Sequence, residues 1–196
     1  AGDLTLEAVN TWGGDTVLAG GTLKAGVAGA IAMGLPVEAA CAAVEKFRPG
    51  FGRMEKFDLG AQGTRMVLIK NAAGCNQVLS FLLTQREPFR LVFVTNNRPA
   101  DGTDVSWLED AKFERLTAME PLQVVTLSGL CADTVRERLI RAGVAEDKLS
   151  VQPDLGALAD EVAAAEGPVF ILPSYTGMME FRPRLIRKCG GKEFWE

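Results

Sequence analysis

The sequence contains no histidine, and it has a single tyrosine among its 196 residues. Histidine is the general base of Ser-His-Asp and Cys-His catalysis, in which it activates the attacking hydroxyl or thiol. Catalysis of either kind therefore cannot be completed within this chain, and a self-sufficient hydrolase of these classes is excluded.

An excess of basic residues is also absent, since 21 Lys and Arg stand against 25 Asp and Glu and the net charge is -4. Without a basic cluster, no nucleic-acid partner is expected. No apolar run reaches the roughly 18 residues of a membrane-spanning helix, and the N-terminus lacks the pattern of a signal peptide. These absences predict a cytoplasmic protein with no transmembrane segment.

Metal and phosphate motifs are missing as well. Cys41, Cys75, Cys131 and Cys189 are too far apart for a CxxC metal knuckle, so we expect reduced core thiols and no bound metal. Residues 20–26, GGTLKAG, lack the GxxxxGK[ST] order that places a lysine on phosphates and a hydroxyl on magnesium. We expect no ATP hydrolysis by this chain alone.

What the sequence does have is 47% hydrophobic residues, enough for a full core. Beyond residue 51, short apolar runs alternate with helix-length stretches. This alternation predicts an α/β fold with a Rossmann-like, doubly wound and mostly parallel sheet. The expected strands are 66–69, 91–94, 122–127, 149–151 and 169–172. The expected helices are 75–84, 132–142, 155–165 and 177–188, the last bent or begun near Pro183.

A domain boundary is expected near residue 50, where RPGFG at 48–52 combines a proline with two glycines. Before it, two helical stretches at 23–33 and 37–47 are separated by Gly-Leu-Pro. We therefore expect a short helical segment at 1–50, followed by the α/β domain at 51–196.

The most informative stretch is 89–110, FRLVFVTNNRPADGTDVSWLED. Residues 91–94 are apolar on both parities, as in a strand buried on both faces. The polar, turn-prone residues that follow end the strand, so the chain leaves the sheet at the carboxyl edge, where open α/β sheets bind ligands. The alternative is an ordinary solvated loop.

Five blocks of sequence carry a resemblance: 51–57, 69–79, 94–116, 128–144 and 171–182. In this order they resemble the C-terminal domain of the MurT subunit of lipid II isoglutaminyl synthase, a relative of the Mur ligases. The match runs from Phe51 to the end of the chain. Residues 20–50 are similar to the end of the Mur central domain, although the asparagines expected there are absent.

The resemblance implies a two-subunit amidotransferase. With ATP and Mg²⁺, the complete enzyme would activate the α-carboxyl of D-glutamate in lipid II at the inner face of the membrane. A GatD-like glutaminase partner would supply ammonia, together with the cysteine and histidine of a triad whose aspartate comes from the MurT C-terminal domain. Asp104 is the first candidate for that aspartate, Asp101 the second and Asp110 the third. The alternative for each is a turn or helix-cap carboxylate.

The resemblance also suggests residues that would meet the nucleotide. Arg53, beside Glu55, matches the interdomain linker of the Mur ligases, with a surface salt bridge as the alternative. The remaining nucleotide candidates are Lys70, Asn71, Asn97 and Arg98, and the neighbouring Asn76, Asn96, Ser174, Tyr175 and Thr176 are expected around the same cleft.

The sequence departs from a complete Mur ligase, because an N-terminal substrate domain and a central domain with a P-loop are not present in it. The chain is then either a fragment or a free-standing domain, and by itself it should ligate nothing. Two other functions remain open. One is a non-catalytic α/β module that docks a partner or contacts a nucleotide, and the other is the C-terminal domain of another Mur-type ATP-dependent amide ligase.

Overall fold

The computed structural model describes residues 36, 39 and 52–189 of the chain. The chain divides into two units, Ala1–Pro49 and Gly50–Glu196. The helical pair expected at 23–47 lies outside the described residues except for residues 36 and 39, and so do the glycine-rich stretch at 20–26 and the residues next to the boundary expected near residue 50. They remain predictions.

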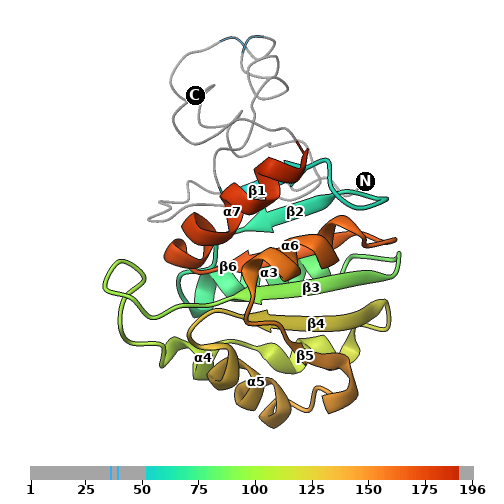
Figure 1. The fold of residues 1–196 in the computed structure, drawn as a ribbon. Helices are drawn as coiled ribbons and strands as arrows, with labels where there is room; N and C mark the ends of the chain where they lie inside the picture. The colour runs from blue at the N-terminus through green and yellow to red at the C-terminus, as the bar shows by residue number, and fades with distance from the viewer. Residues whose placement is uncertain (1–35, 37–38, 40–51, 190–196) are drawn as a thin grey trace. The chain divides into compact units, whose positions relative to one another are not determined.

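Six strands form one sheet in the order β1-β2-β6-β3-β4-β5 (Figure 1). Their bounds are Arg53–Phe57 for β1, Thr64–Val67 for β2, Phe89–Val94 for β3, Leu122–Ser128 for β4, Leu149–Val151 for β5 and Val169–Pro173 for β6. Each neighbouring pair from β2 to β5 is parallel, whereas β1 is antiparallel to β2. The α/β fold with a mostly parallel sheet is confirmed.

Strand β1 was not among the expected strands. It is an edge strand in which Phe57 is the one fully buried residue, because its other residues face solvent or lie only partly covered. An edge strand of this kind needs no continuous apolar run, so the sequence pattern does not predict it.

The helices are α3 Ala72–Leu82, α4 Trp107–Asp110, α5 Ala132–Arg141, α6 Leu155–Ala163 and α7 Tyr175–Cys189, with 3-10 turns η1 Phe113–Ala118 and η2 Glu146–Lys148. Helix α3 begins before the expected residue 75, because Asn71 caps it by accepting the Gly74 N–H at 2.8 Å. Helix α7 likewise begins before the expected residue 177 and continues through Pro183.

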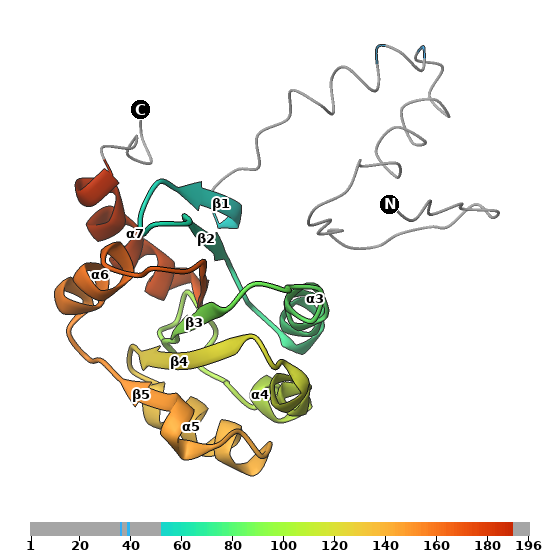
Figure 2. The ribbon, with the colours of Figure 1, turned by 90° about the vertical axis from the view of Figure 1, so that its right-hand side faces the viewer.

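Helices cover both faces of the sheet (Figure 2). Residues of α3, α4, η1 and α5 join one hydrophobic cluster, and residues of α6 and α7 join the other. The central strand β3 serves both, since Leu91 and Phe93 belong to the first cluster and Val92 and Val94 to the second. The strand expected to be buried on both faces is therefore confirmed.

The cysteines among the described residues are free thiols. Cys75 lies in the core, and burial raises the pKa of its thiol to about 12. Burial and the neighbouring Asp101 carboxylate also raise the pKa of Cys131. These two thiols are therefore poor nucleophiles at neutral pH.

A nearly buried ion pair joins β1 to α7. Arg182 Nη2 and Nε approach Glu55 Oε1 at 2.7 and 2.9 Å, and the two side chains are 8% and 15% exposed. The Gly52 N–H also donates to Glu55 Oε2 at 3.3 Å. Glu55 therefore takes part in an interior contact between distant elements.

We expect Glu55→Gln to lower the free energy of unfolding by about 3 kcal/mol, because it removes the negative charge that Glu55 places beside a buried guanidinium. Urea unfolding of the chain measures this change. The matched control is Glu137→Gln, an exposed position on α5 where the change should stay within about 0.5 kcal/mol. Equal stabilities of the two variants would contradict the expectation.

Candidate functional site

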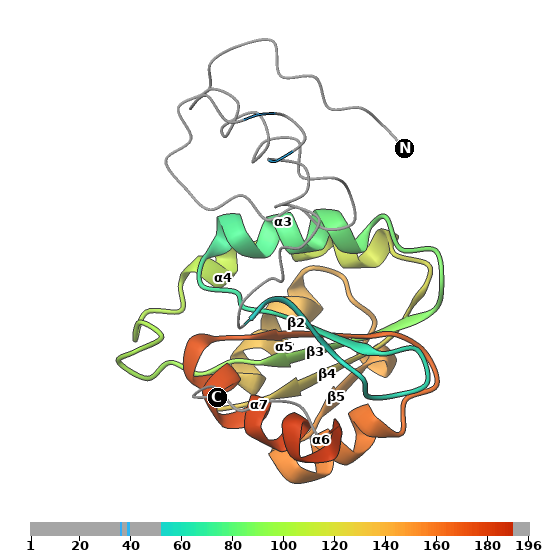
Figure 3. The same cartoon turned by 90° about the horizontal axis from the view of Figure 1, so that it is seen from above.

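The candidate site lies at the carboxyl edge of the sheet, where the loop after β3 extends beyond the strands (Figure 3). From neighbouring strands β3 and β6 the chain continues to opposite faces, to α4 after β3 and to α7 after β6. Such a switch point is where open α/β sheets form binding crevices. A pocket of about 270 Å³ opens here, lined by Leu68, Ile69, Lys70, Asn96, Ala100, Asp101, Gly102, Val105, Trp107, Ser174 and Tyr175.

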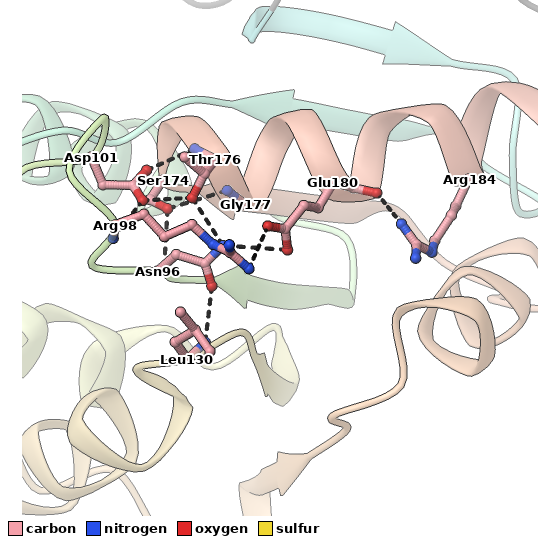
Figure 4. A network of polar contacts seen from close by, with 9 residues as sticks. All are labelled: Asn96, Arg98, Asp101, Leu130, Ser174, Thr176, Gly177, Glu180 and Arg184. Carbon is pink, nitrogen blue, oxygen red and sulfur yellow. Dashed lines mark hydrogen bonds and ion pairs between the residues drawn. The ribbon is translucent and has the colours of Figure 1, made fainter.

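Asn96 connects the strand ends around this pocket (Figure 4). Its backbone N–H donates to Ser174 Oγ at 3.0 Å, and its Nδ2 donates to Thr176 Oγ1 at 3.0 Å. Its Oδ1 accepts the Leu130 N–H at 2.9 Å. The side chain is 2% exposed, so this amide is used within the protein and joins the ends of β3, β4 and β6.

Asp101 binds the beginning of α7 (Figure 4). Its Oδ1 accepts the Thr176 N–H at 2.7 Å, and its Oδ2 accepts the Thr176 hydroxyl at 2.5 Å. The Arg98 N–H donates to the same Oδ2 at 3.1 Å. This half-buried carboxylate thus accepts three hydrogen bonds from within the chain.

Asp104 lies three residues further along the same loop and is exposed. It accepts the Ser106 N–H at 2.8 Å and the Ser106 hydroxyl at 2.9 Å. The backbone donor, followed by the hydroxyl donor, lowers the pKa of the Asp104 carboxyl. The side chain closes a turn ahead of α4, and it is an ionised, accessible carboxylate at neutral pH.

The other residues suggested by sequence differ in their positions and contacts. Asp110 is the exposed last residue of α4. Of the five nucleotide candidates, Lys70 lines the pocket, while Asn71 caps α3 and Arg98 pairs with Glu180 at 3.0 Å. Arg53 and Asn97 are exposed, on β1 and after β3. The structure therefore does not bring these five residues into one pocket.

Arg138 is a residue that the sequence analysis missed. From α5 its Nε donates to Leu108 O at 3.1 Å and its Nη2 to Ala111 O at 2.8 Å, while its guanidinium lies over the Phe113 ring. The side chain also pairs with Glu114 at 2.8 Å and is 7% exposed. It fixes the segment that follows Asp104. Its position in the sequence could have indicated that it is buried, because Arg138 falls between Val135 and Leu139 on the apolar stripe of α5.

Within residues 52–189, no three His, Cys, Asp or Glu side chains are grouped so that they could hold a metal ion. In the same part of the chain, every helix is too short or too polar to cross a membrane.

Comparison of sequences places this chain near known proteins. The family model described as MurT ligase C-terminal matches residues 68–178. The chain is 32% identical over 145 residues to the MurT subunit of the glutamine-hydrolysing lipid II isoglutaminyl synthase of Streptococcus pneumoniae, covering 74% of the chain and 32% of the relative. Its identity to the Staphylococcus aureus MurT subunit is 29% over 148 residues, covering 75% and 33%. The chain thus spans about a third of the length of these curated relatives.

Solved structures with a similar fold include two ligases. The UDP-N-acetylmuramate-alanine ligase MurC of Thermotoga maritima has a TM-score of 0.53 at 12% identity, over 83% of this chain and 36% of that one. The folylpolyglutamate synthase of Mycobacterium tuberculosis, complexed with ADP, has a TM-score of 0.56 at 15% identity, over 84% and 38%. At these identities the similarity concerns the fold alone.

The hydrogen bonds at Asp104 generate a prediction about its titration. We expect Ser106→Ala to raise the pKa of Asp104 part of the way to its ordinary value, because the hydroxyl donor is lost and the backbone donor remains. Ser106→Thr, which keeps a hydroxyl, is the control. NMR titration of the carboxyl carbon measures the pKa, and an unchanged value in Ser106→Ala would disprove the assignment of the cause.

The lowered pKa of Asp104 makes the free energy of unfolding depend on pH. These hydrogen bonds stabilise the folded chain above the pKa that Asp104 has when unfolded, and the contribution is lost as the pH falls through the folded-state pKa.

Proposed function

The chain belongs to the MurT ligase C-terminal family, and from this premise we propose that it works in a glutamine-dependent amidotransferase, lipid II isoglutaminyl synthase. That enzyme would amidate the α-carboxyl of D-glutamate in lipid II, in the cytoplasm at the inner face of the membrane. The Streptococcus pneumoniae relative is a subunit of a glutamine-hydrolysing synthase, which supports a GatD-like glutaminase as the partner of this chain.

The task assigned to this domain is to complete the partner's active site through Asp104. In a catalytic triad the carboxylate accepts a ring N–H of the histidine, orients the imidazole and stabilises the imidazolium that forms when the nucleophile is deprotonated. Because this chain has no histidine, the imidazole and the cysteine would both come from the glutaminase. This chain would supply the carboxylate, whose negative charge orients the partner's imidazole.

The observation that carries the proposal is the exposed, ionised state of Asp104 on the loop at the carboxyl edge. Two hydrogen bonds from Ser106 hold the carboxylate in place. A carboxylate has about four lone-pair positions, so two remain for a partner's imidazole. Asp104 is thus both oriented beforehand and accessible to a second protein.

The other two carboxylates suit this task less well. Asp101 is half-buried and already accepts three hydrogen bonds from within the chain, so by the same count one lone-pair position is left for a partner's histidine, against two at Asp104. Asp110 is exposed, but it is the last residue of α4 and does not take part in the turn that orients Asp104. Asp104 therefore remains the first choice, with Asp110 as the alternative to test.

ATP and Mg²⁺ belong to the complete enzyme, where ATP would activate the carboxyl group of lipid II. The ADP bound to the Mycobacterium tuberculosis synthase, which has this fold, is consistent with nucleotide binding in the wider family. The described residues do not fit a magnesium site, and of the nucleotide candidates Lys70 is the one that lines the pocket. We therefore propose that Lys70 contacts the nucleotide. We assign no step of the ligation to this domain.

We expect Asp104→Asn to lower the rate of glutamine hydrolysis by the chain in complex with its GatD-like glutaminase by about 10²–10⁴-fold. The amide keeps the shape of the side chain but lacks the charge that fixes the tautomer and stabilises the imidazolium. Asp104→Asn should still co-purify with the glutaminase, since a single exposed carboxylate carries little of an interface.

Asp110→Asn is the matched control, because it makes the same change at an exposed carboxylate a few residues away. Activity that is lost in Asp110→Asn and kept in Asp104→Asn would move the assignment to Asp110. Full activity in both of these variants and in Asp101→Asn would mean that the chain is a docking module that contributes no triad residue.

A further inference from the structure

The loop that carries Asp104 is held in place by another of its own side chains, Asp101. We infer that Asp101 is a positioning residue: it ties residues 98–104 to the start of α7 and so sets where Asp104 stands at the carboxyl edge. This inference rests on the proposed function of Asp104 and gives Asp101 a task distinct from catalysis.

Burial does not hold this loop. Residues 97–100 and 102–104 are all exposed, and Asp101 between them is half-buried. The loop contains two turns, in which the Asp101 N–H donates to Arg98 O at 2.8 Å and the Gly102 N–H to Pro99 O at 3.3 Å. Because so little apolar surface is covered, hydrogen bonds decide the position of the loop.

The side-chain contacts of Asp101 connect these turns to the rest of the domain. Its Oδ2 accepts the Arg98 N–H, which ties the carboxylate to the start of the loop. The N–H and hydroxyl of Thr176 donate to its two oxygens at 2.7 and 2.5 Å. The Thr176 hydroxyl also accepts a hydrogen bond from Asn96 Nδ2, so it links the buried amide to the loop. A second contact, between Arg98 and Glu180, is exposed and contributes little.

The start of α7 is a firm attachment point. The Ser174 N–H donates to Val94 O at 3.0 Å, and a Cβ at Gly177 would lie 2.1 Å from the same oxygen, so the helix packs directly on the end of β3. Further along, Arg182 binds Glu55 of β1. A loop tied to Thr176 is therefore tied to the sheet.

Asp104 stands between two such attachments. Upstream, Gly102 and Thr103 alone separate it from Asp101, and Gly102 has a φ of +88° that directs the chain there. Downstream, Arg138 binds the carbonyl oxygens of Leu108 and Ala111. Loss of the upstream attachment would free the backbone before Asp104 while the segment after it stays fixed.

A displaced carboxylate lowers turnover more than substrate binding, since a misplacement of about 1 Å in a catalytic group can cost on the order of 10²-fold. The variant that tests the tie without touching either aspartate is Thr176→Val, which removes the hydroxyl and keeps the backbone N–H. Thr176→Ser restores the hydroxyl and is the conservative control.

The first measurement uses the chain alone. In Thr176→Val, the backbone amides of Arg98 and Asp101 should exchange hydrogen about tenfold faster, because one charge-assisted bond holding the loop is lost. Exchange in Thr176→Ser should match the unmodified chain. Unchanged exchange in Thr176→Val would overturn the inference whatever the function of Asp104.

The second measurement is a double-mutant cycle on glutamine hydrolysis by the chain in complex with its GatD-like glutaminase. Thr176→Val alone should lower kcat about tenfold, with the KM for glutamine unchanged and with recovery in Thr176→Ser. In the Asp104→Asn background, Thr176→Val should change kcat by less than about twofold, because the residue it positions is already disabled.

The outcomes separate the two hypotheses. If Asp104→Asn and Thr176→Val lower kcat independently, the inference is overturned while the proposed function stands. If Asp101→Asn abolishes turnover while Thr176→Val leaves it intact, Asp101 is itself the triad residue and the inference is again overturned. If Asp104→Asn has no effect, the proposed function fails and the positioning of Asp104 fails with it.

Discussion

The hydrogen bonds of one buried amide, Asn96, hold together the edge of the sheet on which the site depends. Parallel strands end side by side, and their carboxyl ends leave backbone groups that must find partners away from water. Asn96, two residues after β3, accepts the Leu130 N–H after β4, and its own N–H and Nδ2 donate to the hydroxyls of Ser174 and Thr176 at the start of α7. The loop after β3 begins from this point, so its position depends on the same contacts.

Helix α7 connects these contacts at the carboxyl edge to the rest of the domain. Its first turn binds Asp101 and Asn96, and its third turn binds Glu55 of the edge strand β1 through Arg182. One helix thus connects the antiparallel edge of the sheet to the loop of the candidate site. Asp104 stays exposed on this loop, which is the accessibility that its proposed role in a partner's active site requires.

The sequence alone determined the fold class, the central strand and the family. Apolar runs were sufficient for the inner strands β3 and β6, because strands buried on both faces need continuous apolar runs. The family resemblance is confirmed over residues 68–178, which contain four of the five motif blocks wholly or in large part, while the block at 51–57 lies outside that match. Local patterns failed at β1, since an edge strand with one buried residue has no distinctive period.

Only the tertiary structure decided which contacts each polar residue of the site makes and how far it is exposed. In sequence, Asp101, Asp104 and Asp110 are three similar carboxylates in one segment, and nothing local separates them. The fold brings Thr176 to Asp101 and leaves Asp104 exposed. Likewise, Glu55 and Arg138 could be taken for surface charges until Arg182 and the carbonyl oxygens of Leu108 and Ala111 lay beside them. The physical reason is that a polar side chain is defined by its hydrogen-bond partners, and partners 24 to 127 residues away along the chain meet only when the sheet forms.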